Sequence, residues 1–149
     1  MKRTELREHI FKLVFGVEFH PPEELKKRME LYLEQEEIAG ERDRVYIMDK
    51  TTAVAARIEE IDGLLNRYST GWKTKRMNKA DLSVLRLAVY EMEMDADVPV
   101  SVAINEAVEL AKRFGGEDSP SFINGILAKI AAVREAAEEP QKADDASEP

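Results

Sequence analysis

The amino-acid sequence predicts an all-α protein whose helices pack as a bundle in two lobes, residues 1–70 and 71–139. Three observations support this fold class. Apolar residues recur at three- and four-residue spacings in every long segment, which is the pattern of helices that bury one face. Proline or glycine stands where several of these segments begin or end. The length of 149 residues suits one domain with a shared core.

The longest apolar pattern lies between residues 42 and 68 and predicts one long helix. Its positions alternate four and three residues apart, and they are Ile47, Thr51, Val54, Ile58, Ile61, Leu65 and Tyr68. The pattern covers only about three heptads, so packing in a bundle is favoured over a coiled coil. The segment before it, from Pro22 to Gly40, is acidic and is interpreted as a scaffold helix.

The composition excludes several classes of protein. The chain has no cysteine, so a disulfide framework and a thiolate metal site are both impossible. No apolar run approaches the roughly 18 residues of a membrane-spanning helix, and no apolar signal segment follows the N-terminus, so we expect a cytoplasmic protein. A net charge of -8 argues against sequence-independent coating of nucleic acid, but it allows a local basic face.

The first helix is predicted to run from Thr4, a suitable N-cap, to about Gly16. Its apolar stripe comprises Leu6, Ile10, Leu13, Val14 and Val17. The opposite face reverses the chain's overall charge balance and carries Lys2, Arg3, Arg7 and Lys12. Taken alone, this pattern fits either an ordinary solvated face or a basic binding surface.

A basic segment follows the long pattern. No acidic residue occurs between Asp62 and Asp81, and the cations in this interval are Arg67, Lys73, Lys75, Arg76 and Lys79. Tyr68 and Trp72 stand among them. Cations neutralise phosphates and exposed aromatic rings stack on unpaired bases, so the segment is a candidate RNA-facing surface. The alternative is that Trp72 is a core anchor, because a lone tryptophan is a natural core filler.

The next helix is predicted to be central. Asn78 can cap it, Asp81 suits the positive end of its dipole, and it is apolar almost all round. Arg86 and Glu91 are unusual on such a helix, because buried charges need partners. These partners are either internal or on another protein.

Two further helices are joined by a turn from Gly115 to Pro120. The first runs from about Val100 to Phe114, and Gly115 is expected to end it in the left-handed conformation. Ser119 and Pro120 predict the start of the second, from about Ser121 to Val133. Residues 140–149 are acidic, carry no apolar stripe, and are predicted to form a disordered tail.

Signals for catalysis are poor. The two histidines, His9 and His20, have no matched acid or nucleophile, and the chain has no glycine-rich phosphate loop. Gly115 and Gly116 follow a predicted helix, so they indicate a helix stop and not a nucleotide cradle. We therefore expect neither an enzyme, nor a cofactor, nor a metal site.

Several long stretches are similar to the NusB family of transcription antitermination factors. They are the segments 81–91 (DLSVLRLAVYE), 97–99 (DVP), 103–115 (AINEAVELAKRFG), 117–119 (EDS) and 122–130 (FINGILAKI), together with Arg3, Arg7, Glu8 and the stretch 11–13 in the first helix. A match of about fifty residues is far more specific than a short motif.

The resemblance implies about seven helices in two packed bundles and a protein without catalytic activity. It also implies binding of the boxA element of ribosomal RNA leader transcripts together with the ribosomal protein NusE, so that RNA polymerase resists termination. Some relatives of this fold are appended to RNA-modifying methyltransferases, but we expect no cofactor-binding domain in this protein.

The resemblance further implies which residues take part. The residues expected to contact RNA are Lys2, Arg3, Arg7, Tyr68, Lys73, Arg76, Asp118, Ser119 and Phe122. The residues expected to contact NusE are Asp81, Arg86 and Glu91. An internal pair between Arg86 and Glu91, with Asp81 serving the helix end, is the alternative for the second set.

Two questions stay open from the sequence. The first helix carries Glu5 and Glu8 among its cations, so the affinity for RNA without NusE could be low. Apolar edges that receive NusE could equally be covered by a second copy of the chain, which would make a homodimer. A helical adaptor that binds only proteins is the competing hypothesis for the function.

Overall fold

The computed structural model describes the backbone of residues 1–147 and the side chains of residues 1–137. The predicted all-α class is confirmed, with seven α-helices in this part of the chain. Their bounds are α1 Arg3–Phe15, α2 Leu25–Gln35, α3 Glu41–Ala56, α4 Ile58–Tyr68, α5 Lys79–Met94, α6 Val100–Phe114 and α7 Ser119–Ser147. Short 3-10 turns are η1 Gly16–Phe19, η2 Pro22–Glu24 and η3 Thr74–Arg76.

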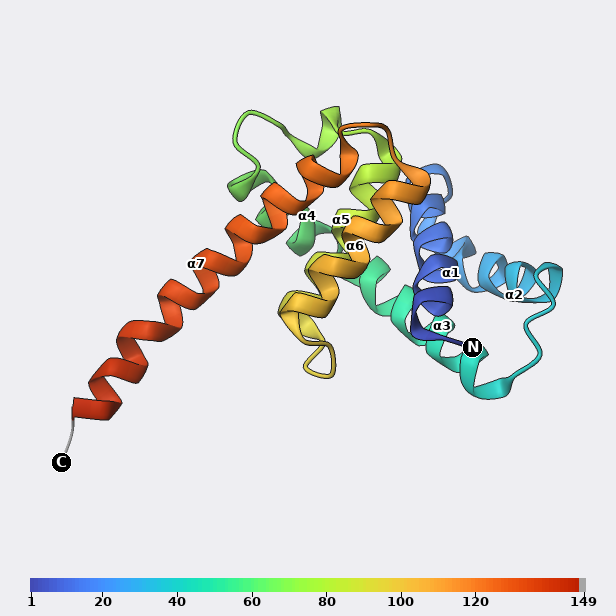
Figure 1. Ribbon diagram of the computed structural model, residues 1–149. Helices are drawn as coiled ribbons and strands as arrows, with labels where there is room; N and C mark the ends of the chain where they lie inside the picture. The colour runs from blue at the N-terminus through green and yellow to red at the C-terminus, as the bar shows by residue number, and fades with distance from the viewer. Residues whose placement is uncertain (148–149) are drawn as a thin grey trace.

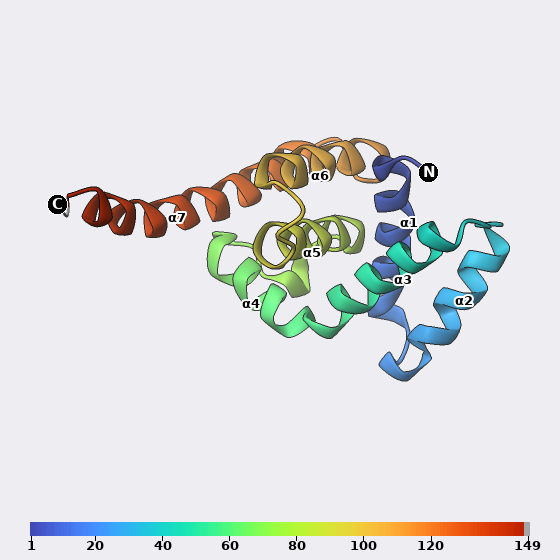
Figure 2. The ribbon, with the colours of Figure 1, turned by 90° about the horizontal axis from the view of Figure 1, so that it is seen from below.

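Helix α5 is the central element, as its sequence predicts. Figures 1 and 2 show α5 enclosed by other helices, and it packs against α1, α4, α6 and α7. Eleven of its 16 residues are buried, which explains why it is apolar almost all round. Asn78 caps it as expected, because its side-chain oxygen accepts hydrogen bonds from the backbone N–H groups of Ala80 (2.8 Å) and Asp81 (3.3 Å).

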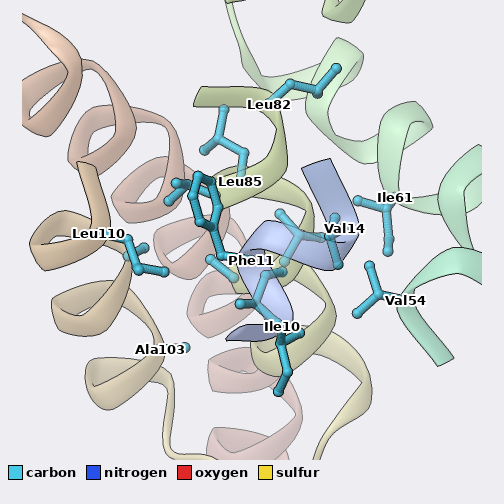
Figure 3. Packing of buried hydrophobic residues seen from close by; sticks show 14 of the residues in the cluster. Ile10, Phe11, Val14, Val54, Ile61, Leu82, Leu85, Ala103 and Leu110 are labelled. Atoms are coloured by element: carbon cyan, nitrogen blue, oxygen red, sulfur yellow. The ribbon is translucent and has the colours of Figure 1, made fainter. Parts of the chain in front are cut away.

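One hydrophobic core joins the two halves of the chain. Figure 3 shows Phe11 of α1 on the side of Leu85 of α5 and Leu110 of α6, and Ile61 of α4 lies on the other side of α1. The predicted lobes, residues 1–70 and 71–139, therefore share buried side chains. This shared core holds the loops that connect the helices in fixed relative positions.

The predicted long helix over residues 42–68 is wrong in one respect. The helix breaks at Arg57, whose φ and ψ are −118° and 18°, so that α3 and α4 are separate. Nevertheless Ile47, Val54 and Leu65 of the apolar pattern are fully buried. Helix α3 packs against α1 whereas α4 packs against α5, and the break lets one continuous pattern face two different helices.

The prediction that Gly115 adopts the left-handed conformation is also wrong. Its φ is −97°, which other residues adopt readily. Glycine is needed for space, because a Cβ atom at this position would lie 2.5 Å from Cβ of Ser119 and 2.8 Å from the carbonyl oxygen of Ala111. The turn between α6 and α7 is tight for that reason.

Both ends of the chain differ from expectation. Thr4 is not the N-cap of α1; that position is Lys2, and the Thr4 hydroxyl instead donates to Oε1 of Glu106 at 3.3 Å. Helix α7 begins at Ser119 and its backbone is helical to Ser147, so it runs into the segment 140–149 predicted to be a disordered tail. The side chains of that segment and residues 148–149 lie outside the described residues, and the disorder stays a prediction.

Candidate nucleic-acid interface

Two aromatic rings from distant parts of the sequence meet at the surface. The centroids of Trp72 and Phe122 are 6.0 Å apart, and the rings are edge to face at 75°. Trp72 lies in the loop between α4 and α5 and is 52% exposed, so the alternative that it anchors the core is wrong. Phe122 lies in the first turn of α7 and is half-buried. The pair separates two hollows.

The first hollow lies between this pair and the start of α5. Its volume is about 460 Å³, and its lining residues are Trp72, Arg76, Met77, Asn78, Asp81, Gly116, Glu117, Asp118, Ser119 and Phe122. We call it the Asp81 hollow. Arg76, Asp118, Ser119 and Phe122, which the resemblance implies as RNA contacts, therefore lie around one depression.

The second hollow lies on the other side of the aromatic pair. Its volume is about 290 Å³, and its lining residues are Tyr68, Ser69, Thr70, Trp72, Ser121, Phe122, Gly125, Ile126 and Lys129. We call it the Tyr68 hollow. The Lys129 ammonium group donates to the Thr70 hydroxyl at 2.8 Å, which ties α7 to the loop that carries Trp72. Tyr68 and Phe122 thus contribute to one surface, as the resemblance implies.

The loop that carries Trp72 is held by local hydrogen bonds. The backbone N–H of Trp72 donates to the carbonyl of Ser69 at 3.1 Å, and the Ser69 hydroxyl donates to the carbonyl of Trp72. Gly71, with φ of 82°, supplies the left-handed residue of this turn. The N–H of Thr74 donates to Oδ1 of Asn66 at 2.8 Å. These contacts hold Trp72 in place before any ligand binds.

Asp118 and Ser119, where α7 begins, have different roles. Ser119 is buried, and its hydroxyl oxygen accepts a hydrogen bond from the N–H of Gly116 at 2.8 Å. Ser119 therefore shapes the turn. Asp118 is exposed at the rim of the Asp81 hollow and is free to meet a ligand.

Two of the expected cations are available to phosphates. Lys73 and Arg76 are exposed and make no ion pair within the described part of the chain. Lys129 lies two helical turns after Phe122 in α7 and is also exposed. Sequence reasoning missed Lys129, although its spacing from Phe122 places both residues on one face of a helix.

Lys2 and Arg3 lie away from the two hollows. Both are exposed, and the neighbouring N-terminal amine lies 3.4 Å from Oδ2 of Asp43 in α3. Figure 1 shows the N-terminus beside α3, whereas α7 starts at the other end of the bundle. The structure therefore does not bring these two cations to the aromatic pair.

Arg7 is not at the surface, contrary to the expectation that it contacts RNA. It is 2% exposed, and its Nε lies 3.1 Å from both carboxylate oxygens of Glu91. Nζ of Lys50 lies 2.8 Å from the same carboxylate and 3.0 Å from that of Asp95. Burial alone would lower the pKa of the Lys50 ammonium, but the Glu91 carboxylate outweighs it and holds that pKa above its ordinary value.

Arg86 and Glu91 are likewise occupied inside the protein, so the prediction that they contact a partner is corrected. Arg86 pairs with Asp62 at 2.9 and 2.6 Å and with Glu18 at 2.6 Å. The alternative pair between Arg86 and Glu91 is not formed. Charges on a buried helix require compensation, and α1, α3, η1 and α4 supply it.

Asp81 differs from these two residues. It is 8% exposed and lines the Asp81 hollow, and its Oδ1 has no hydrogen-bond partner among the described residues. Asn78 already caps the helix, so Asp81 is not occupied by capping. Its predicted contact with a protein partner stays a prediction.

An exposed aromatic pair was missed by sequence reasoning. Phe15 and Phe19 are 36% and 57% exposed, and their ring centroids are 5.2 Å apart. Between them, Glu18 pairs with Arg86 and lies 3.6 Å from Nζ of Lys79, which joins this patch to α5. The sequence held one signal for this pair, because Phe15 does not belong to the apolar stripe of α1. We call Phe15 and Phe19 the aromatic patch.

The fold and the site define an all-helical protein whose candidate site is a shallow surface of aromatic and cationic side chains. The model of the NusB family matches residues 4–132, and the chain belongs to this family. The transcription antitermination protein NusB of Agathobacter rectalis is 47% identical over 131 residues, which cover 88% of this chain and 100% of that protein. NusB of Lachnoclostridium phytofermentans is 45% identical over 87% of this chain and 98% of its own length.

Solved structures agree with this family. The structure of T. maritima NusB is 36% identical in sequence and has a TM-score of 0.80, covering 89% of this chain and 92% of that one. A crystal structure of the antitermination factors NusB and NusE in complex with double-stranded RNA matches with a TM-score of 0.76 at 22% identity, covering 88% and 96%. At that identity the likeness concerns the fold. None of the described helices has the length and apolar character needed to span a membrane.

Proposed function

We propose that this protein is a transcription antitermination factor that binds single-stranded boxA RNA of ribosomal RNA leader transcripts together with the ribosomal protein NusE. It acts on the transcribing RNA polymerase through that complex, in the cytoplasm, and catalyses no reaction. The observation that carries the proposal is the surface pair of exposed Trp72 and half-buried Phe122, with the exposed cations Lys73 and Arg76 nearby, which make no ion pair with the residues that the structure describes.

The aromatic pair suits unpaired bases better than a duplex. Base stacking on an aromatic ring is worth about 1–3 kcal/mol per base, and it needs a ring face that only a splayed base can reach. Trp72 and Phe122 offer such faces toward two hollows, while Lys73, Arg76 and Lys129 offer charges for the phosphates on both sides. An RNA strand crossing the pair would place successive bases in the two hollows.

Family membership supports the role in antitermination. The relatives that match this chain over most of its length carry that function in their names. A more distant NusB was crystallised with NusE and RNA, which supports a joint complex for this chain as well.

We assign the NusE contact to the aromatic patch. Phe15 and Phe19 form an exposed apolar surface next to the ion pairs of Glu18, and aromatic anchors of this kind dominate protein interfaces. Arg86 takes part indirectly, because it holds Glu18 beside the patch. Asp81 and Glu91 are left out of this surface.

The single tryptophan makes the proposal directly testable. Titration of a short boxA RNA, with and without NusE, should change Trp72 fluorescence, and Phe122→Ala should weaken binding about tenfold. Val45→Ala, an exposed apolar change on α3, is the matched control and should bind like the wild type. If the wild type bound RNA in neither mixture, the proposal would be refuted.

The second candidate is a helical adaptor that binds only proteins, which the exposed aromatic patch also supports. The same titration separates the two functions. Binding of NusE without any binding of RNA would identify the adaptor. Phe19→Ser should weaken the binding of NusE and leave the affinity for RNA, measured without NusE, unchanged. Light scattering with this variant would show whether a second copy of the chain uses the same patch.

A further inference from the structure

We propose that Gly125 of α7 keeps the Tyr68 hollow open for RNA, so that one unpaired base enters the hollow and the strand continues along α7 to Lys129. This inference rests on the proposed RNA binding. It adds a residue that acts through the absence of a side chain.

Gly125 is a glycine that the fold itself does not require. It lies inside α7 and its φ is not positive, so other residues could adopt its conformation. A Cβ atom added there would meet no atom of the described residues within 4 Å, so close packing is not the reason either. Glycine inside a helix costs stability relative to alanine. The reason for it is therefore sought in what approaches α7 from outside.

The surroundings of Gly125 distinguish it from Gly63 of α4. A Cβ atom at Gly63 would also meet no atom within 4 Å, so an open helical glycine is not by itself a site. Gly63 lies in a hollow lined by two arginines, two glutamates, a leucine and a methionine, without an aromatic ring. Gly125 lines the Tyr68 hollow, which has three aromatic rings.

The walls of the Tyr68 hollow suit a nucleotide. Tyr68, Trp72 and Phe122 supply rings on which a flat base can stack whatever its identity. Lys129 is the one charged side chain among the described residues that line the hollow, and no carboxylate belongs to this lining. The hollow therefore offers a positive charge without an opposing negative one, which favours the phosphate of a nucleotide.

The position of Gly125 along α7 places it on the path between ring and cation. Ser121, Gly125 and Lys129 are four residues apart, so they lie on one face of the helix. This face meets the loop between α4 and α5 (Figure 1), because the Lys129 ammonium donates to the Thr70 hydroxyl at 2.8 Å. That hydroxyl is neutral and leaves the charge of Lys129 available. A side chain at position 125 would obstruct a strand that joins Phe122 to Lys129.

An acidic side chain of a protein partner is the competing occupant, because it too would meet Lys129. A carboxylate has no flat apolar body to stack on the three rings, and the negative faces of aromatic rings repel it. An unpaired nucleotide carries both a flat base and a negative charge. The combination of rings and one ammonium group therefore favours RNA.

The test measures RNA affinity and stability on the same variants. A 5′-labelled boxA RNA is titrated by fluorescence anisotropy, without NusE and with saturating NusE, and urea denaturation gives the stability. Gly125→Leu should weaken RNA binding by about tenfold or more, as expected for the loss of one stacked base. Gly125→Ala should weaken it less. Both changes should raise the urea midpoint, since alanine and leucine favour a helix more than glycine does.

Gly63→Ala and Gly63→Leu are the matched controls, because they add the same side chains at a second open glycine of a helix. They should raise the urea midpoint and leave RNA affinity unchanged. Lys129→Gln should reduce the slope of log affinity against log salt by about 0.7, the value for one phosphate of a single strand. Gly125→Leu removes no charge and should keep the slope.

RNAs that lack one base at a time identify the base in the hollow. Removal of that base should weaken binding by the wild type. It should not weaken binding by Gly125→Leu any further, because the leucine already excludes the base. The same removal should still weaken binding by Gly63→Leu.

Each other result has a distinct meaning. Unchanged RNA affinity in Gly125→Leu, while the wild type binds RNA, overturns the inference and leaves the proposed function intact. Equal losses of affinity in Gly125→Leu and Gly63→Leu, or a lower urea midpoint in Gly125→Ala, also overturn it. Weakened NusE binding, with unchanged RNA binding in the absence of NusE, assigns the hollow to a protein partner. Absence of RNA binding by the wild type in both mixtures defeats the proposed function itself.

Discussion

Nε of Arg7 lies 3.1 Å from both carboxylate oxygens of Glu91, although 84 residues separate the two in the sequence. Neither side chain is more than 2% exposed. The pair joins α1 to the central helix α5, and Lys50 joins α3 to the same carboxylate. A cation that the family resemblance places on the RNA surface is therefore part of the structural core.

The first prediction concerns Arg7 itself. Arg7→Ala should lower the free energy of unfolding by about 3 kcal/mol, the lower end of the range for a broken buried pair, because Lys50 still faces Glu91. Urea denaturation measures this change. Arg3→Ala, an exposed cation of the same helix, should leave the stability nearly unchanged. A loss of RNA affinity in folded Arg7→Ala without a loss of stability would contradict this role.

The second prediction concerns pH and the pair of Glu18 with Arg86. Burial alone would raise the pKa of the Glu18 carboxyl, but the hydrogen bond and charge of Arg86 outweigh it and hold that pKa below its ordinary value of 4.5. The charged form therefore stabilises the fold above pH 4.5, and this stabilisation is lost as the pH falls through the lower, folded pKa.

The wild type should accordingly be more stable than Glu18→Gln at neutral pH, and the gap should close on acidification. Thermal unfolding across a pH series measures the gap. Glu23→Gln, an exposed carboxylate without an ion pair in the described part of the chain, should show no such closure. A gap that stays constant with pH would refute the assignment.

The third prediction contrasts two glycines. Gly115→Ala should destabilise the fold by about 1–3 kcal/mol, since its methyl group would overlap Ser119 and the Ala111 carbonyl. The methyl group added by Gly63→Ala in α4 would meet no atom within 4 Å. This change should therefore stabilise the fold by roughly 0.5–1 kcal/mol. Both values come from urea denaturation, and equal effects of the two changes would show that close approach is not the reason for Gly115.

The fourth prediction concerns the exposed cations. Arg76→Ala should weaken RNA binding and reduce the slope of log affinity against log salt by about 0.7, the value for one phosphate of a single strand. Arg57→Ala, a cation paired with Glu60 in another region, is the control and should leave the slope unchanged. If Arg76→Ala also left the slope unchanged, Arg76 would lie outside the interface.

Much of the fold follows from local patterns in the sequence. The spacing of apolar residues predicts the helices, Asn78 predicts the start of α5, and the continuous apolar character of α5 predicts its central place. These features depend on neighbours within one or two turns, so they can be predicted without knowing the rest of the chain. The break at Arg57 could not be predicted, because the apolar pattern continues through it without interruption.

The sequence by itself determined the all-helical class, the family, and the residue types available for RNA binding. Only the tertiary structure decided which charges face solvent. Arg7 and Arg86 carry the same formal charge in the sequence as Lys73 and Arg76, but the packing of α1, α3 and α4 on α5 buries both arginines in ion pairs, Arg7 with Glu91 and Arg86 with Asp62 and Glu18. The same packing brings Trp72 to Phe122 and leaves Asp81 unpaired beside them. Burial depends on contacts between distant segments, and local sequence patterns do not specify those contacts.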